Sequence, residues 1–284
     1  MIEIIDFSHN EKGHNSLNNK KHSHNNCYEI LFAYSGNGAV VVKNKLYHLK
    51  KNTIYFINGI ETHCFVPKND TPYIRSKIII KSTYIDTISS IANCRDIIND
   101  LFFEDGGSCI EFDENQSMII NAEFLKIKNS IDAKDVYANI NITLSLFKIL
   151  TLSHSNKNSK MPTIKNNISE VLTYINENIH QKINLDELCA YIHCNKYYLC
   201  HLFKKETNMT INEYIVLQRL AIAKKMLLYT DEPLSNIALG CGFGSFSYFS
   251  KLFKERENIT PRTFRQKYKT NKIEVNIDDV TPKS

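Results

Sequence analysis

The hydrophobic positions of the chain follow two different patterns, one before about residue 84 and another after it. Between residues 22 and 82, short runs of β-branched and aromatic residues alternate with turn formers such as Ser35-Gly36-Asn37-Gly38. Runs this short and this evenly spaced are typical of an antiparallel sandwich or a small barrel. The pattern predicts strands over residues 28–34, 39–42, 46–49, 53–57, 63–66 and 74–80.

After about residue 84 the apolar residues recur every three or four positions, which is the spacing of an amphipathic helix. Helices are predicted over residues 84–103, 116–128 and 136–152, followed by small polar residues that are typical of a linker. From residue 166 the helical spacing continues to about residue 269. We therefore expect an α+β protein with an N-terminal antiparallel β-barrel, trailing helices and an all-α C-terminal domain.

A repeat with an offset of 50 residues lies in the helical second half of the chain. The segment Leu199-Cys200-His201-Leu202-Phe203-Lys204 matches Phe249-Ser250-Lys251-Leu252-Phe253-Lys254. Upstream of these segments the offset becomes 49, so one residue has been inserted between the matching parts. Within a helix this insertion would turn every later side chain to another face, whereas a turn tolerates it. Each copy is therefore predicted to consist of a helix, a tight turn and a second helix.

Start signals indicate where these helices begin. Asn184 can cap the first helix of copy one, and Glu187 is placed for a capping box. In copy two, Pro233 suits the first helical position and Ser245 begins the second helix. The segment Ile211–Tyr229 between the copies has an apolar stripe and is predicted to be one long helix. A rigid helix there would hold the two copies about one duplex turn apart, some 34 Å.

The second helix of each copy is predicted to expose a face without carboxylates. The side chains expected to face the core are Tyr198, Leu199, Leu202, Phe203, Tyr248, Phe249, Leu252 and Phe253. The side chains expected on the opposite faces are Lys196, Tyr197, Cys200, His201, Lys204, Phe246, Ser247, Ser250, Lys251 and Lys254. One such face would be an ordinary solvated helix surface. Two copies favour DNA binding, because donors, hydroxyls and rings suit base edges and phosphates in a major groove.

Composition and charge narrow the class of protein only a little further. The 284 residues carry a formal net charge of +5, so the placement of charge rather than its total must support DNA binding. No apolar run approaches the roughly 18 residues of a membrane span, and the first residues do not resemble a signal peptide. The eight cysteines contain no Cys-x-x-Cys pair. A cytoplasmic protein with reduced thiols is expected.

Residues 168–269 resemble the DNA-binding domain of AraC/XylS-type transcription regulators. The resemblance rests on the matched segments above and on Gln218-Arg219-Leu220-Ala221, Gly242-Phe243 and Thr260-Pro261-Arg262-Thr263-Phe264-Arg265. Cys200-His201 stands where the family commonly has Ser-Arg, and Cys189 where Ala is usual. The resemblance implies a sequence-specific regulator with two helix-turn-helix motifs that bind promoter DNA. It also implies a small-molecule effector, contact with RNA polymerase and a homodimer as further partners. An activator is expected, although the sequence does not decide between activation and repression of transcription.

The N-terminal half resembles a cupin. His22-Ser23-His24, Glu29 and Gly36 resemble the first cupin motif, and Asn58-Gly59 with His63 resembles the second. Metal cupins would use His22, His24, Glu29 and His63 as ligands, a set suited to Fe, Mn, Zn or Ni. Cupin-like sensor domains of AraC-type regulators usually bind an effector without metal, so no metal or other cofactor is expected. The expected effector pocket consists of His22, His24, Tyr28, Glu29, Tyr34, Tyr55 and His63.

The predicted organisation is a cupin-like sensor and dimerisation domain over residues 1–152, a linker over 153–165, a double helix-turn-helix domain over 166–270 and a polar tail over 271–284. Residues 84–152 are the candidate dimerisation helices. Cys27 and Cys64 are expected to fill the core rather than to sense redox state. His9 and His14 are expected to lie in a mobile N-terminal segment without a function.

Two other functions stay open at this point. The first is a metal-dependent cupin enzyme with an accessory helical domain, motivated by the four candidate ligands. The second is a non-specific architectural DNA binder, which the modest net charge disfavours. No Gly-x-Ser-x-Gly motif, phosphate-binding loop or catalytic triad pattern is present, so no catalytic residue is expected.

Overall fold

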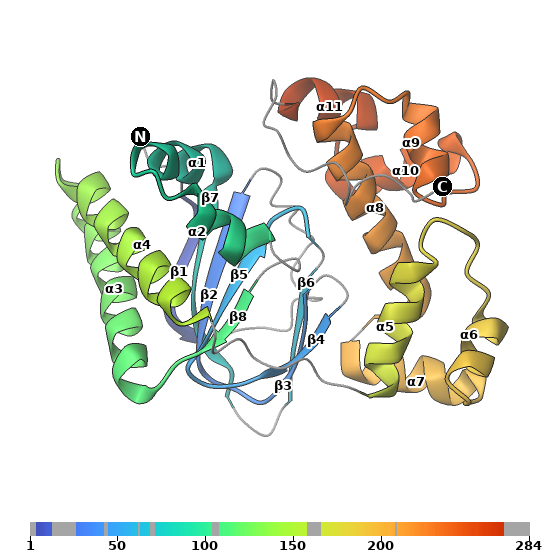
Figure 1. The fold of residues 1–284 in the computed structure, drawn as a ribbon, viewed down its shortest axis with the longest axis horizontal. Coiled ribbons are helices and arrows are strands. Elements are labelled where there is room, and N and C mark those ends of the chain that lie inside the picture. Colours follow the sequence, from blue (N-terminus) through green and yellow to red (C-terminus); the bar gives the residue numbers. More distant parts are fainter. Residues whose placement is uncertain are drawn as a thin grey trace. The chain divides into compact units, whose positions relative to one another are not determined.

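The computed structural model describes residues 4–12, 27–42, 45–61, 63–68, 72–103, 108–157, 166–207 and 209–269. These residues form two compact units, one up to residue 157 and one from residue 166 (Figure 1). The first unit combines antiparallel sheets with helices, and the described part of the second is helical. The expected antiparallel sheet domain and helical C-terminal domain are confirmed.

The first unit contains two antiparallel sheets. A five-stranded sheet has the order β1-β7-β2-β5-β8, and a three-stranded sheet has the order β4-β3-β6. The strands are β1 Ile4–Lys12, β2 Cys27–Ser35, β3 Gly38–Val42, β4 Lys45–Leu49, β5 Thr53–Asn58, β6 His63–Pro67, β7 Ile74–Lys81 and β8 Ser108–Glu111. Every predicted strand is confirmed to within one residue at each end, whereas β1 and β8 were not predicted. Among the described residues no ladder joins the sheets, so they are not closed into the predicted barrel.

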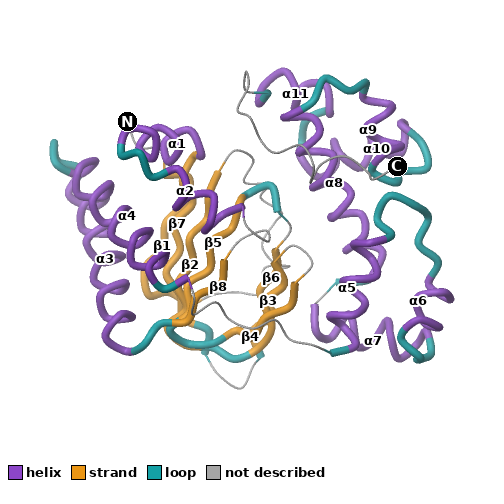
Figure 2. The backbone as a smooth tube through the Cα atoms, viewed as in Figure 1, coloured by secondary structure: helices purple, strands orange, loops and turns teal. Residues whose placement is uncertain are grey.

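The five-stranded sheet has a different apolar layer on each face. Side chains alternate between the faces of a strand, and in β2 Ile30 and Phe32 contact the helices while Leu31 and Ala33 face the three-stranded sheet. The layer between the sheets includes Tyr55 and residues of β3, β4 and β6. Helices cover the other face (Figure 2). The two sheets are therefore joined by apolar packing rather than by backbone hydrogen bonds.

The helices of this unit are α1 Ser82–Ile91, α2 Arg95–Ile98, the π-helical turn η1 Asn99–Phe103, α3 Glu114–Ala133 and α4 Ala138–Ser155. The single helix predicted over residues 84–103 is wrong, because Asn93 has φ +51° and interrupts it. Asp113 and Gln116 form a capping box at the start of α3. Lys134, with φ +52°, ends α3 and allows α4 to return beside it.

The second unit contains α5 Asn167–Glu177, α6 Leu185–Tyr191, α7 Lys196–Thr207, α8 Ile211–Tyr229, α9 Leu234–Gly240, α10 Phe246–Glu257 and α11 Pro261–Tyr268. The repeat is confirmed, since α6–α7 and α9–α10 close with the same backbone bond. The N–H of Cys194 donates to the Cys189 carbonyl, and that of Phe243 donates to the Ala238 carbonyl, both at 3.0 Å. No helix among the described residues is long and apolar enough to cross a bilayer.

Two of the four predicted start signals are confirmed. The Asn184 side chain accepts from the N–H of Asp186 at 2.9 Å, and Ser245 caps α10. The capping box at Glu187 is wrong, because this carboxylate accepts from the Asn184 side-chain amide at 3.3 Å instead of from the backbone. Pro233 precedes α9 as its N-cap rather than occupying its first position.

Candidate nucleic-acid interface

The exposed face of α7 carries the side chains predicted for the first copy. Leu199 and Phe203 are buried. The exposed residues are Lys196, Tyr197, Cys200, His201 and Lys204. The rings of Tyr197 and His201, one helical turn apart, stack with centroids 6.4 Å apart and an interplanar angle of 19°. This face offers a cation at each end and flat rings between them.

The face of α10 is its counterpart in the second copy. Phe249 and Phe253 are fully buried and contact each other, with ring centroids 5.5 Å apart. Phe253 also contacts Phe264 of α11 at 5.3 Å, so the buried side of α10 rests on an aromatic row. Phe246, Ser247, Lys251 and Lys254 are exposed, and Ser250 is half-buried. The aromatic row leaves the polar side of α10 facing outward.

Two tyrosines lie on the opposite side from the one predicted. Tyr198 and Tyr248 were expected to face the core, yet they are 49% and 52% exposed. Both occupy the third position of their helix. Leu202 and Leu252, also expected inside, are half-buried. α7 and α10 therefore each expose a tyrosine side chain that helical periodicity alone assigned to the core.

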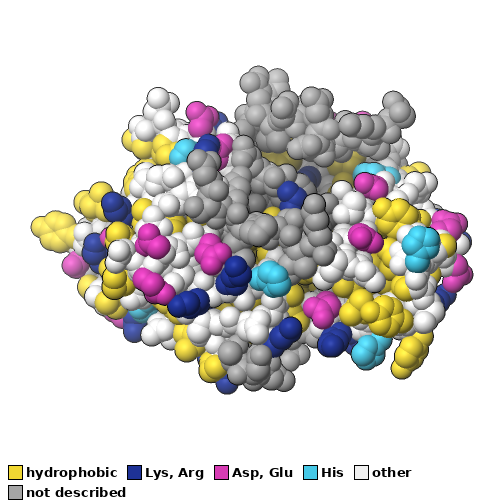
Figure 3. Space-filling view, turned by 60° about the horizontal axis from the view of Figure 1, so that its bottom comes forward, with side chains coloured by type: hydrophobic (Ala, Val, Ile, Leu, Met, Phe, Trp, Pro, Cys, Tyr) yellow, Lys and Arg dark blue, Asp and Glu magenta, His cyan; other side chains and the backbone are white. Residues whose placement is uncertain are grey.

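A carboxylate from the preceding helix lies next to the exposed face of α7. Lys196 Nζ of α7 lies 3.5 Å from Asp186 Oδ1 of α6, and both side chains are exposed. Side chains of both charges, histidines and hydrophobic groups are exposed over α6 and α7 (Figure 3). An exposed pair of this kind is weak, so Lys196 can exchange its carboxylate for another anion. The carboxylate comes from the preceding helix, which the pattern within α7 cannot reveal.

The two motifs are bonded to each other next to α8. Arg219 of α8 donates from Nε to the Ile179 carbonyl at 2.9 Å and from Nη2 to the Gln181 carbonyl at 2.6 Å. His180 Nδ1 lies 2.6 Å from the carbonyl of Gly240 at the end of α9. The segment just before α6 is thus tied both to α8 and to the second motif. These bonds oppose independent rotation of the two motifs.

A buried ion pair fixes α10 on α8. Lys224 Nζ of α8 lies 3.4 Å from Glu257 Oε1, at the last residue of α10, and both side chains are buried. Removing one partner of such a pair leaves the other charge buried, which is strongly destabilising. The pair therefore holds α10 against α8.

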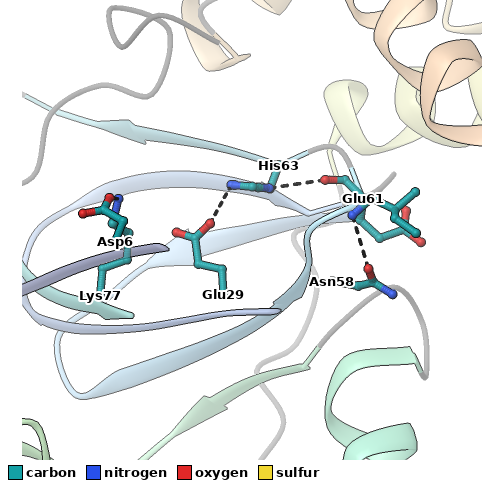
Figure 4. Close-up of polar contacts among 7 residues, drawn as sticks. Asp6, Glu29, Asn58, Glu61, His63 and Lys77 are labelled. Atoms are coloured by element: carbon teal, nitrogen blue, oxygen red, sulfur yellow. Dashed lines mark hydrogen bonds and ion pairs between the residues drawn. The ribbon is translucent and has the colours of Figure 1, made fainter. Parts of the chain in front are cut away.

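Between the two sheets of the first unit, Glu29 and His63 form a pair. Glu29 Oε2 of β2 lies 3.2 Å from His63 Nε2 of β6, and the two side chains point toward each other (Figure 4). His63 Nδ1 lies 3.3 Å from the Glu61 carbonyl. Burial acts to lower the pKa of His63, but the facing carboxylate and these hydrogen bonds raise it above its ordinary value. The pair is an ionisable contact that joins the two sheets, and the charge of Lys77 on β7 also acts on His63.

The expected pocket tyrosines are divided by the five-stranded sheet. Tyr55 lies between the sheets, and its hydroxyl donates to the His48 carbonyl at 3.3 Å. Tyr28 and Tyr34 face the helices instead. The Tyr28 hydroxyl donates to Asp86 Oδ1 at 3.2 Å, and that of Tyr34 bonds to Ser76 Oγ at 2.7 Å. Strand alternation explains the division, since Tyr28 and Glu29 are neighbours on β2 and must face opposite sides.

The remaining histidines have different outcomes. His22, His24 and His14 lie outside the described residues. His9, which was expected in a mobile segment, belongs instead to strand β1, and its Nδ1 lies 2.9 Å from Ser76 Oγ. Within the described ranges, no three His, Cys, Asp or Glu side chains gather as a metal site would require. Cys27 and Cys64 are buried, as core residues are.

The chain is similar to known helix-turn-helix transcription regulators. Residues 188–267 match a family model described as a helix-turn-helix domain. The chain is 34% identical over 119 residues to an uncharacterized HTH-type transcriptional regulator of Pseudoalteromonas carrageenovora, covering 41% of this chain and 70% of that protein. It is 22% identical over 254 residues to the HTH-type transcriptional activator RhaR of Enterobacter sp. (strain 638), covering 87% of each. It is also 29% identical over 120 residues to the regulatory protein PocR of Salmonella typhimurium, covering 42% of this chain and 40% of PocR.

The chain belongs to the AraC/XylS family of transcription regulators. The family model spans α6 to α11 of this AraC/XylS regulator and so contains both helix-turn-helix motifs. The protein is a DNA-binding transcription regulator. The sequence predicted both helix-turn-helix motifs but gave no sign of the contacts made by His180, Lys224 and Glu257. Their partners lie 33 or more residues away, and nothing in the local pattern marks them.

Proposed function

We propose that this chain is a sequence-specific transcriptional activator whose α7 and α10 enter successive major-groove segments on one face of a promoter. The observation that carries the proposal is the pair of motifs with the same turn, joined by the bonds of Arg219 and His180. At about 1.5 Å per residue, the 19 residues of α8 extend about 28 Å. That length is of the order of the 34 Å turn that separates successive major-groove segments.

The exposed side chains divide into two roles within this proposal. Lys204, Lys251 and Lys254 are cations placed to contact phosphates, which supply affinity without sequence information. The remaining predicted residues would meet base edges; they are Tyr197, Cys200, His201, Phe246, Ser247 and Ser250. Lys196 would contact DNA after leaving Asp186. The exposed Tyr198 and Tyr248 add one phenol to each face.

The test is the double substitution Lys251→Ala with Lys254→Ala. We expect weaker binding to a promoter fragment bound by the wild-type protein, and a slope of log affinity against log salt that is less steep by about two. Lys12→Ala with Lys68→Ala, two exposed lysines of the first unit that lie outside α3 and α4, is the matched control and should change neither quantity. Unchanged binding by the α10 variant would contradict the placement of α10 on DNA.

The sheet unit is proposed to be a cupin-like sensor that binds a small effector between its sheets. The Glu29–His63 pair supports this, because burying ionisable groups is costly and such a pair is a natural place for a polar ligand to bind. Small molecules that raise the melting temperature of the wild-type protein but not of Glu29→Gln would identify the effector class. Stoichiometric Fe, Mn, Zn or Ni in protein purified without chelators would instead favour the metal-dependent cupin enzyme.

A homodimer through α3 and α4 is proposed as the assembled state. The large apolar side chains exposed on these helices and just before α4 are Met118, Ile119, Leu125, Val136, Tyr137, Ile140 and Leu144. Tyr137, Ile140 and Leu144 follow the three-and-four spacing of a coiled-coil seam and are 63%, 58% and 62% exposed. A contiguous exposed apolar stripe of this kind marks an interaction site. Contact with RNA polymerase, and action in the cytoplasm where promoters lie, stay predictions.

A further inference from the structure

Three of the eight cysteines lie in the first helix-turn-helix motif. Cys189 lies on α6, Cys194 in the turn and Cys200 on α7, and all three are free thiols. The Cys194 N–H donates to the Cys189 carbonyl at 3.0 Å, which brings the two residues together across the turn. Their thiols also contact each other through a hydrogen bond. Two thiols already in contact need little movement to become a disulfide.

The second motif shows that the fold does not require these thiols. At the equivalent positions it has Ala238, Phe243 and Ser250. Its turn nevertheless closes with the same backbone bond, at the same 3.0 Å. Cys189 and Cys194 therefore bring to the first motif a chemistry that its structural copy lacks.

We propose that Cys189 and Cys194 are a redox-sensitive dithiol that a peroxide oxidises to an intramolecular disulfide, and that this bond weakens the hold of α7 on DNA. The second half of the statement rests on the proposed function of α7. The first half concerns the thiols alone.

The half-buried Cys194 is the attacking group and the buried Cys189 is the resolving group. The Cys194 thiolate attacks one oxygen of hydrogen peroxide, the O–O bond breaks, and hydroxide leaves and takes a proton to become water. The sulfur of Cys189, losing its proton, then attacks the Cys194 sulfenic acid, whose oxygen leaves as a second water. Two thiols are oxidised to one disulfide, and one peroxide is reduced to two waters.

Burial sets the rate of this reaction. It raises the pKa of both the Cys189 and the Cys194 thiol, although the bond from Cys189 acts in the opposite direction at Cys194. Since the thiolate is the nucleophile, oxidation is slow at neutral pH and accelerates as the pH rises. The dithiol therefore responds to sustained oxidant rather than to brief exposure.

The bond would act on α7 through the turn. The contact between the two sulfurs must contract to about 2 Å, which draws the end of α6 toward the turn. That turn sets the direction in which α7 leaves α6. The second motif, having no thiol pair, keeps its geometry and its share of the DNA contact.

Tryptic mapping of the oxidised full-length chain tests the dithiol directly. Lys182 and Lys196 are successive cleavage sites, so Cys189 and Cys194 fall in the same peptide, 183–196, while Cys200 falls in the next, 197–204. After hydrogen peroxide and then a thiol-alkylating reagent, we expect the peptide 183–196 to escape alkylation and to be lighter by two hydrogen atoms. Dithiothreitol should reverse both changes. Cys200→Ser should leave this peptide's oxidation unchanged.

The effect on DNA is measured with the same samples and a promoter fragment that the reduced protein binds. Oxidation should weaken wild-type binding by about tenfold or more, the scale of losing a good set of base contacts. Cys189→Ala, which copies Ala238 of the second motif, and Cys194→Ala should both abolish this sensitivity. A fully alkylated peptide, a bridge between peptides 183–196 and 197–204, or a disulfide without loss of affinity would overturn the proposal. Failure of the reduced protein to bind any duplex would instead contradict the proposed function, while the peptide map would still decide the dithiol.

Discussion

At the scale of single residues, Gly242 occupies a position that a side chain cannot share. Its φ of +83° is strained for other residues, and a Cβ there would lie 2.5 Å from the Ile179 carbonyl oxygen and 2.9 Å from Arg219 Nε. Gly242→Ala should therefore lower the free energy of unfolding by about 2 kcal/mol or more, measured by urea unfolding.

Gly244, two residues later in the same turn, is the matched control. A Cβ there would meet nothing within 4 Å, and its φ is not in the left-handed region. Gly244→Ala should change the free energy of unfolding by less than about 1 kcal/mol. Equal losses in the two variants would show that the contact with Ile179 and Arg219 is unimportant.

His63 should make the stability of the sheet unit depend on pH. Its pKa is raised above the ordinary 6.5 by Glu29 and hydrogen bonds, which outweigh the opposite effect of burial. A raised pKa in the folded state means that the protonated form stabilises the fold. This contribution is complete below the unfolded-state pKa and is lost as the pH rises through the folded-state pKa. The free energy of unfolding of the wild type, relative to His63→Gln, should fall as the pH rises above about 6.5, the ordinary pKa of histidine. A difference that stays constant or grows would rule out this role.

The residues that sequence reasoning placed correctly are those that local spacing controls. Leu199 and Phe249 were predicted to be buried and are, because both lie on the apolar side that helical spacing assigns to the core. Tyr198 and Tyr248 were also predicted to be buried, but they are 49% and 52% exposed, because tertiary packing decides which side chains at the start of a helix are covered. Glu29 and His63 were expected in one pocket, and their side chains do contact each other. Tyr28 was expected in the same pocket but faces the other side of the sheet, because neighbouring residues of a strand point to opposite faces.

At the scale of elements, the exposed stripe on α4 predicts how the chain associates. Leu144→Lys would place a charge in the middle of the proposed seam with Tyr137 and Ile140. We expect the sedimentation coefficient to change from that of a dimer to that of a monomer, because burying an unpaired cation is costly. Thr87→Lys, on the exposed side of α1, should leave the assembly unchanged. A Leu144→Lys variant that sediments with the wild type would remove α4 from the interface.

The elements that could be predicted are those marked by a local sequence signal. Strands β2 to β7 are bounded by turn formers, and the helix-turn-helix copies confirm each other by repetition. In contrast β1 is a partly exposed strand whose residues pair with β7 some 70 positions later, as in Phe7 with Ile78. The four-residue β8 similarly depends on β5. Long-range pairing of short or exposed strands leaves little periodicity to detect.

At the scale of the whole molecule, we propose that the two motifs act as one rigid unit when they bind DNA. The sequence predicted the two motifs and the helix between them, because the repeat marks both copies and so delimits the segment that joins them. It did not predict what prevents them from turning independently, since the bonds of Arg219 and His180 and the Lys224–Glu257 pair join distant segments. Rigidity of this kind makes the distance between the two halves of the binding site a fixed quantity.

The most direct test of this claim is to change that distance in DNA. Once footprinting has mapped a bound promoter site, about 5 base pairs inserted between its two halves would rotate one half to the other face of the duplex. The account predicts that affinity falls as far as it does when one half-site is replaced by unrelated sequence. Affinity that survives the insertion, with both half-sites still protected, would show that the motifs move independently and would contradict the account.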